Sequence, residues 1–131
     1  MVTGRCQCGA IAYKADGDPV HSSLCHCSDC RRSAGAPMVG WALFAEERVT
    51  ISGAPVTYQS SDNVSRAFCG TCGTGLFYRN PVAFPGMVDI QTGTLDDPSA
   101  LPPQAHIQVA DAPSWMADAH ELPKFDRYPS G

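Results

Sequence analysis

Seven cysteines in three short groups are the feature that most constrains this chain of 131 residues. Cys25, Cys27 and Cys30 lie within six residues and are followed at once by Arg31 and Arg32. The other four form two pairs, Cys6 with Cys8 and Cys69 with Cys72. Three thiols so close cannot all pair with one another as disulfides, and thiols beside guanidinium groups ionise and bind metal readily. We therefore expect metal sites rather than a disulfide framework.

Length and charge limit the remaining possibilities. A chain of this length is expected to form one domain, here residues 1–131. Its formal net charge of −4 and its nine Lys and Arg residues argue against binding to nucleic acid or to a membrane surface. No apolar run has the length of a signal peptide or a membrane span. We expect a cytoplasmic protein whose thiols are reduced.

Short apolar segments separated by turn signals predict a mainly β domain. Strands are expected at residues 9–15, 20–24, 38–44, 48–51, 56–59, 64–68, 75–78, 87–92 and 105–109. The segment 38–44 is apolar throughout, which is typical of a central strand with both faces covered. One helical turn is expected from an N-cap at Ser28 to Gly35. Residues 111–131 are rich in Pro and aromatic residues, so we expect an irregular tail that packs on the domain.

The spacing of the cysteines suggests how they are divided. Cys69 and Cys72 have the two-residue separation of a structural zinc loop, and Cys6 with Cys8 would complete four ligands. Three cysteines then remain, which is the ligand number of a catalytic zinc with an open position. Spacing also allows Cys69 and Cys72 to share an ion with two central cysteines. A third possibility is that the central cysteines are buried and metal-free.

Other candidate residues carry weaker signals. His26 lies between two candidate ligands, but in an extended segment its side chain points away from theirs, so we do not expect it to bind metal. His106 has no assigned role. Trp41, Phe44 and Phe84 are expected in the apolar core rather than in a pocket.

Three cysteine motifs in this order resemble the glutathione-dependent formaldehyde-activating enzyme family, which includes centromere-protein-V-like proteins. The motifs are GRCQCG at residues 4–9, CHCSDCRRSAGAP at 25–37 and FCGTCGTGLFY at 68–78, and the segments 113–115 and 122–125 resemble the closing motif of the family. The resemblance implies short, bent antiparallel sheets of the β-tent (Mss4-like) type, held together by zinc. It also implies a structural zinc on Cys6, Cys8, Cys69 and Cys72 and a catalytic zinc on Cys25, Cys27 and Cys30, with the second site open to partial occupancy.

The activity implied by the resemblance is that of a carbon–sulfur lyase, which forms or cleaves the adduct of glutathione and formaldehyde. We expect a small thiol and aldehyde as substrates, with glutathione as the candidate thiol. Arg31 and Arg32 are candidates for binding substrate carboxylates, because guanidinium groups bind carboxylates through paired hydrogen bonds. The alternative is a non-catalytic, zinc-ribbon-like module for protein interaction, which would need only the four-cysteine site.

Overall fold

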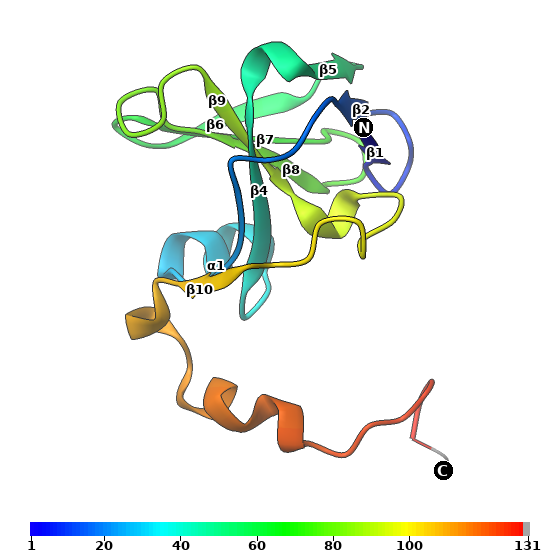
Figure 1. Cartoon of the computed structure of the whole chain (residues 1–131), viewed down its shortest axis with the longest axis vertical. Coiled ribbons are helices and arrows are strands. Elements are labelled where there is room, and N and C mark those ends of the chain that lie inside the picture. The colour runs from blue at the N-terminus through cyan, green and yellow to red at the C-terminus, as the bar shows by residue number, and fades with distance from the viewer. Residues whose placement is uncertain (130–131) are drawn as a thin grey trace.

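The computed structural model describes residues 1–129, and the prediction of a mainly β fold is confirmed (Figure 1). Within these residues the strands are β1 Val2–Arg5, β2 Ala12–Ala15, β3 His21–Cys25, β4 Val39–Ala45, β5 Val49–Ser52, β6 Val56–Ser61, β7 Val64–Phe68, β8 Gly75–Arg79, β9 Met87–Gln91 and β10 Ala105–Ile107. The α-helix is α1 Ser28–Ala34, and 3-10 helices cover Glu46–Arg48, Thr92–Thr94, Val109–Asp111 and Ser114–Glu121. No helix in this part of the chain has the length and apolar character needed to cross a membrane.

The strands form two sheets. β1, β2 and β5 make a three-stranded antiparallel sheet. The larger sheet has seven strands in the order β10-β3-β4-β9-β8-β7-β6 and is antiparallel except where β10 runs parallel to β3. Register shifts interrupt the β6–β7 and β7–β8 pairs, and such irregularities bend a sheet. The expected bent antiparallel sheets are therefore present, with one parallel edge strand.

The main core contains residues of both sheets. Tyr13 and Ala15 of β2, with Ile11 just before that strand, share it with apolar residues of the large sheet, namely Ala42, Phe44, Ala67, Leu76, Phe77, Val88 and Ile90. The rings of Tyr13 and Phe77 meet edge to face across the two sheets, with centroids 5.6 Å apart. Because successive side chains of a strand point to opposite faces, this core occupies one face of the large sheet, and other side chains cover the second face.

The opposite face carries a row of side chains that the strand register brings together. His21 pairs with Leu43, Leu43 with Asp89, Asp89 with Tyr78, and Tyr78 with Arg66. Paired residues on adjacent strands lie side by side on the same face of a sheet. Five strands, β3, β4, β9, β8 and β7, therefore present one residue each along a single line. A second, smaller apolar cluster on this face includes Cys25, Cys30, Val39 and Trp41.

One strand was missed, and the expected start of the helix was wrong. β1 was not predicted, because Val2–Arg5 is short and half polar, and it forms by pairing with β2. The helix α1 begins after Cys27 rather than Ser28, since the sulfur of Cys27 accepts a hydrogen bond from the Cys30 N–H. The predicted end of this helix at Gly35 is confirmed, with φ +64°.

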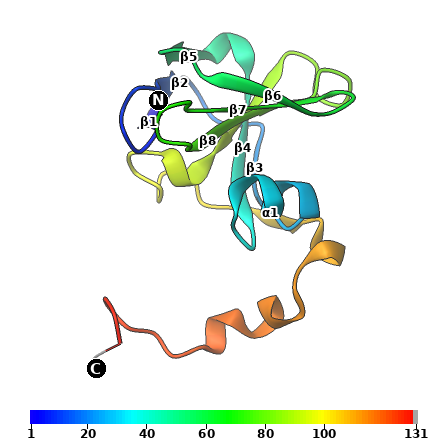
Figure 2. The same ribbon diagram turned by 180° about the vertical axis from the view of Figure 1, so that it is seen from behind.

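The C-terminal segment differs from the expectation that residues 111–131 pack on the domain. Figures 1 and 2 show the chain leading away from the sheets after the 3-10 helix Val109–Asp111. Trp115, Leu122, Phe125 and Tyr128 are all exposed, Tyr128 by 92%. Pro, Asp and Lys residues interrupt these apolar positions, so the segment has no continuous apolar face with which to pack. The last two residues of the expected tail lie outside the described residues.

Candidate functional site

Four cysteines from the two sheets come together in one cluster. Cys6 and Cys8 lie in the turn between β1 and β2 of the small sheet, and Cys69 and Cys72 lie in the turn between β7 and β8 of the large sheet. Their four sulfur atoms all lie within 4.8 Å of one another. The cluster therefore connects turns of the two sheets that are separated by some sixty residues of chain.

The geometry of this cluster fits a tetrahedral metal ion. The sulfur of Cys8 lies 3.7 Å from that of Cys6 and 3.7 Å from that of Cys69. Four sulfurs at the usual zinc distance of about 2.3 Å from one ion would be about 3.8 Å apart. Backbone N–H groups donate to three of the sulfurs, as they do to thiolates: Ile11 to Cys6, Ala10 to Cys8, and Thr71 and Cys72 to Cys69. These residues could hold a metal ion without rearrangement.

A hydrogen bond favours the ionised form of the fourth sulfur. The Thr74 hydroxyl lies 3.2 Å from the sulfur of Cys72. This contact is the largest of several that together lower the pKa of Cys72 to about 5. A thiol that ionises this easily is suited to bind a divalent cation.

The other three cysteines form a second cluster. Cys25 is the last residue of β3, Cys27 precedes α1, and Cys30 lies in the first turn of that helix. Their sulfurs also lie within 4.8 Å of one another, and no fourth His, Cys, Asp or Glu ligand joins them within residues 1–129. The structure therefore keeps the two groups apart, as the division into four and three expected.

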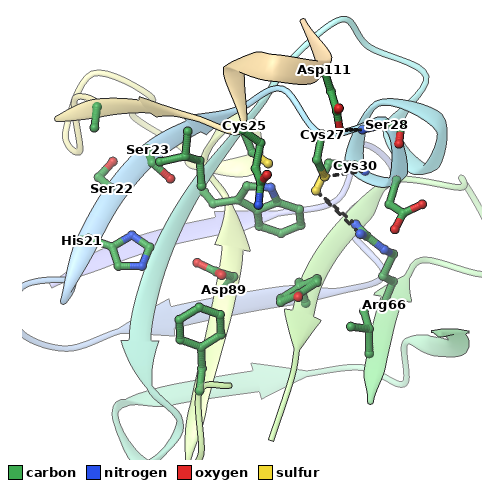
Figure 3. A pocket seen from close by; sticks show the side chains of 18 of the residues that line it. His21, Ser22, Ser23, Cys25, Cys27, Ser28, Cys30, Arg66, Asp89 and Asp111 are labelled. Atoms are coloured by element: carbon green, nitrogen blue, oxygen red, sulfur yellow. Dashed lines mark hydrogen bonds between the residues drawn. The ribbon is translucent and has the colours of Figure 1, made fainter. Parts of the chain in front are cut away.

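The three-cysteine cluster lines a cavity of about 580 Å³ (Figure 3). On the free face of the large sheet, opposite the main core, four of the five residues of the row line this cavity: His21, Asp89, Tyr78 and Arg66. Trp41 and Phe84 add apolar walls, whereas Phe44 is buried in the main core. The expectation of core placement is therefore confirmed for Phe44 and for Trp41, which is 4% exposed in the smaller apolar cluster and also lines the cavity. Phe84 is 37% exposed at the cavity wall and does not belong to the core.

Arg66 is the cation next to this cluster. Both terminal nitrogens of its guanidinium lie 3.6 Å from the sulfur of Cys30, and its Nε donates to the Ser60 hydroxyl. The guanidinium also lies over the Tyr78 ring, 5.1 Å from its centroid. Arg66 is only 8% exposed, so its charge acts through a poorly solvated environment. It supplies the positive charge that the sequence suggested for Arg31 and Arg32.

Arg31 and Arg32 do not line the cysteine cavity. Successive helical residues point about 100° apart, so with Cys30 turned toward the cavity the next two residues point elsewhere. Arg32 lines a neighbouring cavity of about 540 Å³, which shares Asp29, Trp41 and Arg66 with the first. The Nε of Arg31 is buried and has no hydrogen-bond partner among residues 1–129.

The three thiols differ in how readily they ionise. Burial raises the pKa of Cys25 to about 12 and also raises that of Cys30. Burial opposes ionisation of Cys27 as well, but the N–H of Cys30 and neighbouring thiols donate to its sulfur and lower its pKa overall. Negative charge in the protein alone is therefore best accommodated on Cys27.

His26 points away from the cavity, as expected. It is 1% exposed, and its Nε2 lies 2.9 Å from Nδ1 of His106 on β10. Its backbone N–H donates to Ile107. His26 and His106 thus connect the cysteine segment to the parallel edge strand, a structural role that the sequence did not suggest.

Asp89 is a further candidate that the sequence analysis missed. Its carboxylate lines the cavity, although the side chain is only 7% exposed. The signal available in the sequence was one carboxylate between the apolar residues Val88 and Ile90 of the segment Met87–Gln91. Such a position is unusual in a buried strand and often indicates function.

Comparison with known proteins finds a matching family and relatives. The model of the family described as glutathione-dependent formaldehyde-activating enzyme matches residues 1–111. A Halomonas elongata protein named "Putative glutathione-dependent formaldehyde-activating enzyme" is 27% identical over 126 residues, covering 88% of this chain and 80% of that protein. An uncharacterized lyase of Schizosaccharomyces pombe is 33% identical over 75 residues, and the match spans 57% of this chain and about half, 55%, of the lyase.

The fold also has a solved counterpart. A crystal structure of a Rhodobacter sphaeroides protein superposes with a TM-score of 0.59 and 23% sequence identity, covering 79% of this chain and 98% of the other. This similarity concerns the fold alone. The family match covers both cysteine clusters, β1 to β10 and the residues that line the cavity. The chain therefore belongs to the glutathione-dependent formaldehyde-activating enzyme family.

Proposed function

We propose that this protein is a zinc-dependent carbon–sulfur lyase that acts on thiol adducts of formaldehyde or another small aldehyde, with glutathione as the thiol. The observation that carries the proposal is the three-cysteine cluster at the wall of a large cavity, separate from a four-cysteine cluster that needs no further ligand. Three protein ligands facing a cavity are typical of catalytic zinc, whereas four are typical of structural zinc. The family name and the lyase relative support the same class of reaction.

In this proposal Cys6, Cys8, Cys69 and Cys72 hold a structural zinc, and Cys25, Cys27 and Cys30 hold a catalytic one. A zinc ion held by the three cysteines would lower the pKa of a substrate thiol and polarise an aldehyde oxygen. Three thiolates around one Zn²⁺ leave a net charge of −1. The buried guanidinium of Arg66 offsets that charge through its two contacts with Cys30.

The arginines of α1 have a separate proposed role. Arg32 lines the second cavity, which continues from the first across Trp41 and Arg66. A substrate whose thiol lies at the cysteines can therefore extend toward Arg32, and glutathione carries carboxylates at both ends that a guanidinium would bind. Arg31 faces neither cavity, so we assign it no substrate contact and keep the substrate-binding proposal for Arg32.

We also propose that residues 1–131 function as one domain. Because both clusters need reduced thiols, we propose a reducing compartment such as the cytoplasm. The alternative function, a non-catalytic module for protein interaction, is favoured by one observation. Trp115, Leu122, Phe125 and Tyr128 expose apolar surface on the C-terminal segment. That function would leave the three-cysteine cluster without a purpose, and it therefore ranks second.

Exchange NMR tests the proposed reaction directly. Glutathione and formaldehyde are mixed, and the rate at which the free thiol and its adduct interconvert is measured with zinc-loaded protein and with buffer alone. The wild-type protein is expected to accelerate the exchange, and Cys27→Ser is expected to lose at least about 100-fold of that acceleration. Thermal unfolding of Cys27→Ser, which keeps the four-cysteine site, is the control for folding. Equal acceleration by both proteins would contradict the proposal.

A further inference from the structure

Strand register places Asp89 in the middle of the cavity floor. Its neighbours in the row are Leu43 on β4 and Tyr78 on β8, with His21 and Arg66 one strand further on each side. Figure 3 shows the carboxylate between His21 and Arg66, facing the space below the cysteines. Val88 and Ile90, the residues on either side of it, point into the main core. The strand thus holds Asp89 rigidly on the free face of the sheet.

The carboxylate has unused hydrogen-bonding capacity. Asp89 is only 7% exposed, and its Oδ1 has no hydrogen-bond partner within residues 1–129. Arg66, the nearest buried cation in the row, directs its donors to Cys30 and Ser60 instead. Removal from water without a compensating partner raises the pKa of Asp89 to about 7. An orphaned carboxylate in a cavity is costly, and such costs concentrate where chemistry is done.

We propose that Asp89 is the catalytic acid and base of this site and carries one proton between the sulfur of the substrate thiol and the oxygen of the aldehyde. The inference rests on the proposed function, which it deepens by assigning a residue to proton transfer. The three cysteines are unsuited to that task because they are the proposed metal ligands. Arg66 is unsuited as well, since a guanidinium does not release its proton in proteins.

The reaction balances with this single proton. In the direction of adduct formation, the Asp89 carboxylate accepts the proton of the thiol as the S–H bond breaks. The sulfur electron pair forms the carbon–sulfur bond, and the π pair of the carbonyl group moves onto oxygen. Asp89 then returns its proton to that oxygen, which becomes the hydroxyl of the adduct. Cleavage follows the same steps in reverse, so Asp89 ends each cycle in its starting state.

Other ionisable groups face the same cavity and could share the task. They are His21 on β3, Asp29 on α1, Arg66 on β7, Tyr78 on β8, Asp111 in its 3-10 helix and the three thiols. His21 is the competing proton carrier, because it lies in the same row and its ring contacts Phe84 at the cavity wall. The test therefore includes a His21→Gln variant.

The test compares wild-type protein, Asp89→Asn, His21→Gln and Asp62→Asn, all loaded with zinc. Asp62 is exposed in the turn between β6 and β7 and does not line the cavity, which makes Asp62→Asn the matched control for an Asp to Asn change. Exchange NMR of glutathione with formaldehyde is measured from pH 5 to pH 9. Carbon-13 NMR of labelled Asp carboxyl groups follows the titration of Asp89 itself, and elemental analysis confirms equal zinc content.

Asp89→Asn is expected to lose about 10²- to 10⁴-fold of the acceleration, the usual contribution of a general acid and base. Its remaining rate should lack the step near pH 7, and the carboxyl signal missing from this variant should titrate near pH 7 in the wild type. Asp62→Asn should match the wild type. Two results would overturn this inference and leave the proposed function intact. One is full activity in Asp89→Asn, and the other is a pH step that is lost in His21→Gln but kept in Asp89→Asn. Absence of acceleration by the wild type would overturn both.

Discussion

Arg66 is the residue that turns the three-cysteine cluster into a balanced site. A buried guanidinium must be paired, because removing it from water costs several kcal/mol. Here its partners are the Cys30 sulfur, the Ser60 hydroxyl and the face of Tyr78. These contacts hold the charge against the ligands of the proposed zinc and away from Asp89. One arginine therefore explains both how three thiolates are tolerated and why the nearby carboxylate is left without a partner.

The raised pKa of Asp89 predicts how stability changes with pH. Below about pH 4 the carboxyl group is protonated in both the folded and the unfolded chain, so its burial costs little. As pH rises toward 7 the unfolded chain releases the proton while the folded protein retains it, and stability falls. Above pH 7 the loss is complete. Each pKa unit corresponds to about 1.4 kcal/mol, so the penalty reaches at most about 4 kcal/mol and is smaller where water enters the cavity.

Asp89→Asn removes this ionisation and should therefore gain stability relative to the wild type between pH 4 and pH 7, by about 2–4 kcal/mol. Urea unfolding at several pH values measures the difference in free energy of unfolding, and Asp62→Asn serves as the control. A difference between Asp89→Asn and wild type that is constant from pH 4 to pH 8 would show that Asp89 has an ordinary pKa.

At the scale of elements, the turns between strands fix the register that builds the site. Gly53, between β5 and β6, has φ +90°, and a Cβ there would overlap the carbonyl oxygen of Ala10 next to the four-cysteine cluster. Gly86 has a similar φ of +70°, but a Cβ would meet nothing within 4 Å. Substituting Ala at each glycine therefore separates two losses of stability: that of the left-handed backbone conformation, present at both, and that of a steric clash, present only at Gly53.

Gly86→Ala should cost about 1 kcal/mol of stability, the price of placing Ala in the left-handed region. Gly53→Ala should cost about 3 kcal/mol, because the Ala10 backbone must also shift. Chemical denaturation of the two variants beside the wild type gives both values. Equal losses would mean that the Ala10 contact is relieved without strain.

The sequence alone could predict most of the strands and the cysteine groups, but not the pairing of distant strands. The strands were predictable because apolar runs and turn residues are local signals, and the cysteine groups because ligand spacing is local too. Asp89 and Arg66 were not predictable as partners of the cysteines. They reach one cavity only because β4 pairs with β9, which follows it by some forty residues, and no local pattern specifies that pairing. The arginines of α1 were favoured because they adjoin Cys30 in sequence, but the helix turns them elsewhere.

For the whole molecule, the four-cysteine cluster joins the two sheets at the edge of their shared core. Cys6 and Cys69 are both 1% exposed and belong to that core. Zinc binding contributes about 10–16 kcal/mol in small domains, more than the roughly 5–15 kcal/mol of net stability that a domain has. The fold is therefore expected to depend on this cluster, whereas the three-cysteine cluster lies on the free face of one sheet and can lose its ion without separating the sheets.

Cys72→Ser should accordingly yield little soluble protein, because it leaves the cluster between the sheets with three thiols. Cys27→Ser should yield folded protein, since it alters only the cavity wall and the cap of α1. Soluble yield and circular dichroism of the two variants provide the comparison. A soluble, folded Cys72→Ser protein that retained both ions would show that the structural role of the cluster is wrongly assigned.

The central claim is that the seven cysteines form two separate metal sites, one closed and one open to a cavity. Elemental analysis of purified protein counts the zinc ions per chain and tests this claim without any assumption about substrate. We expect two zinc ions per chain for the wild type and one for Cys27→Ser. One zinc ion per chain in both proteins would contradict it, because the three cysteines at the cavity would then hold no metal.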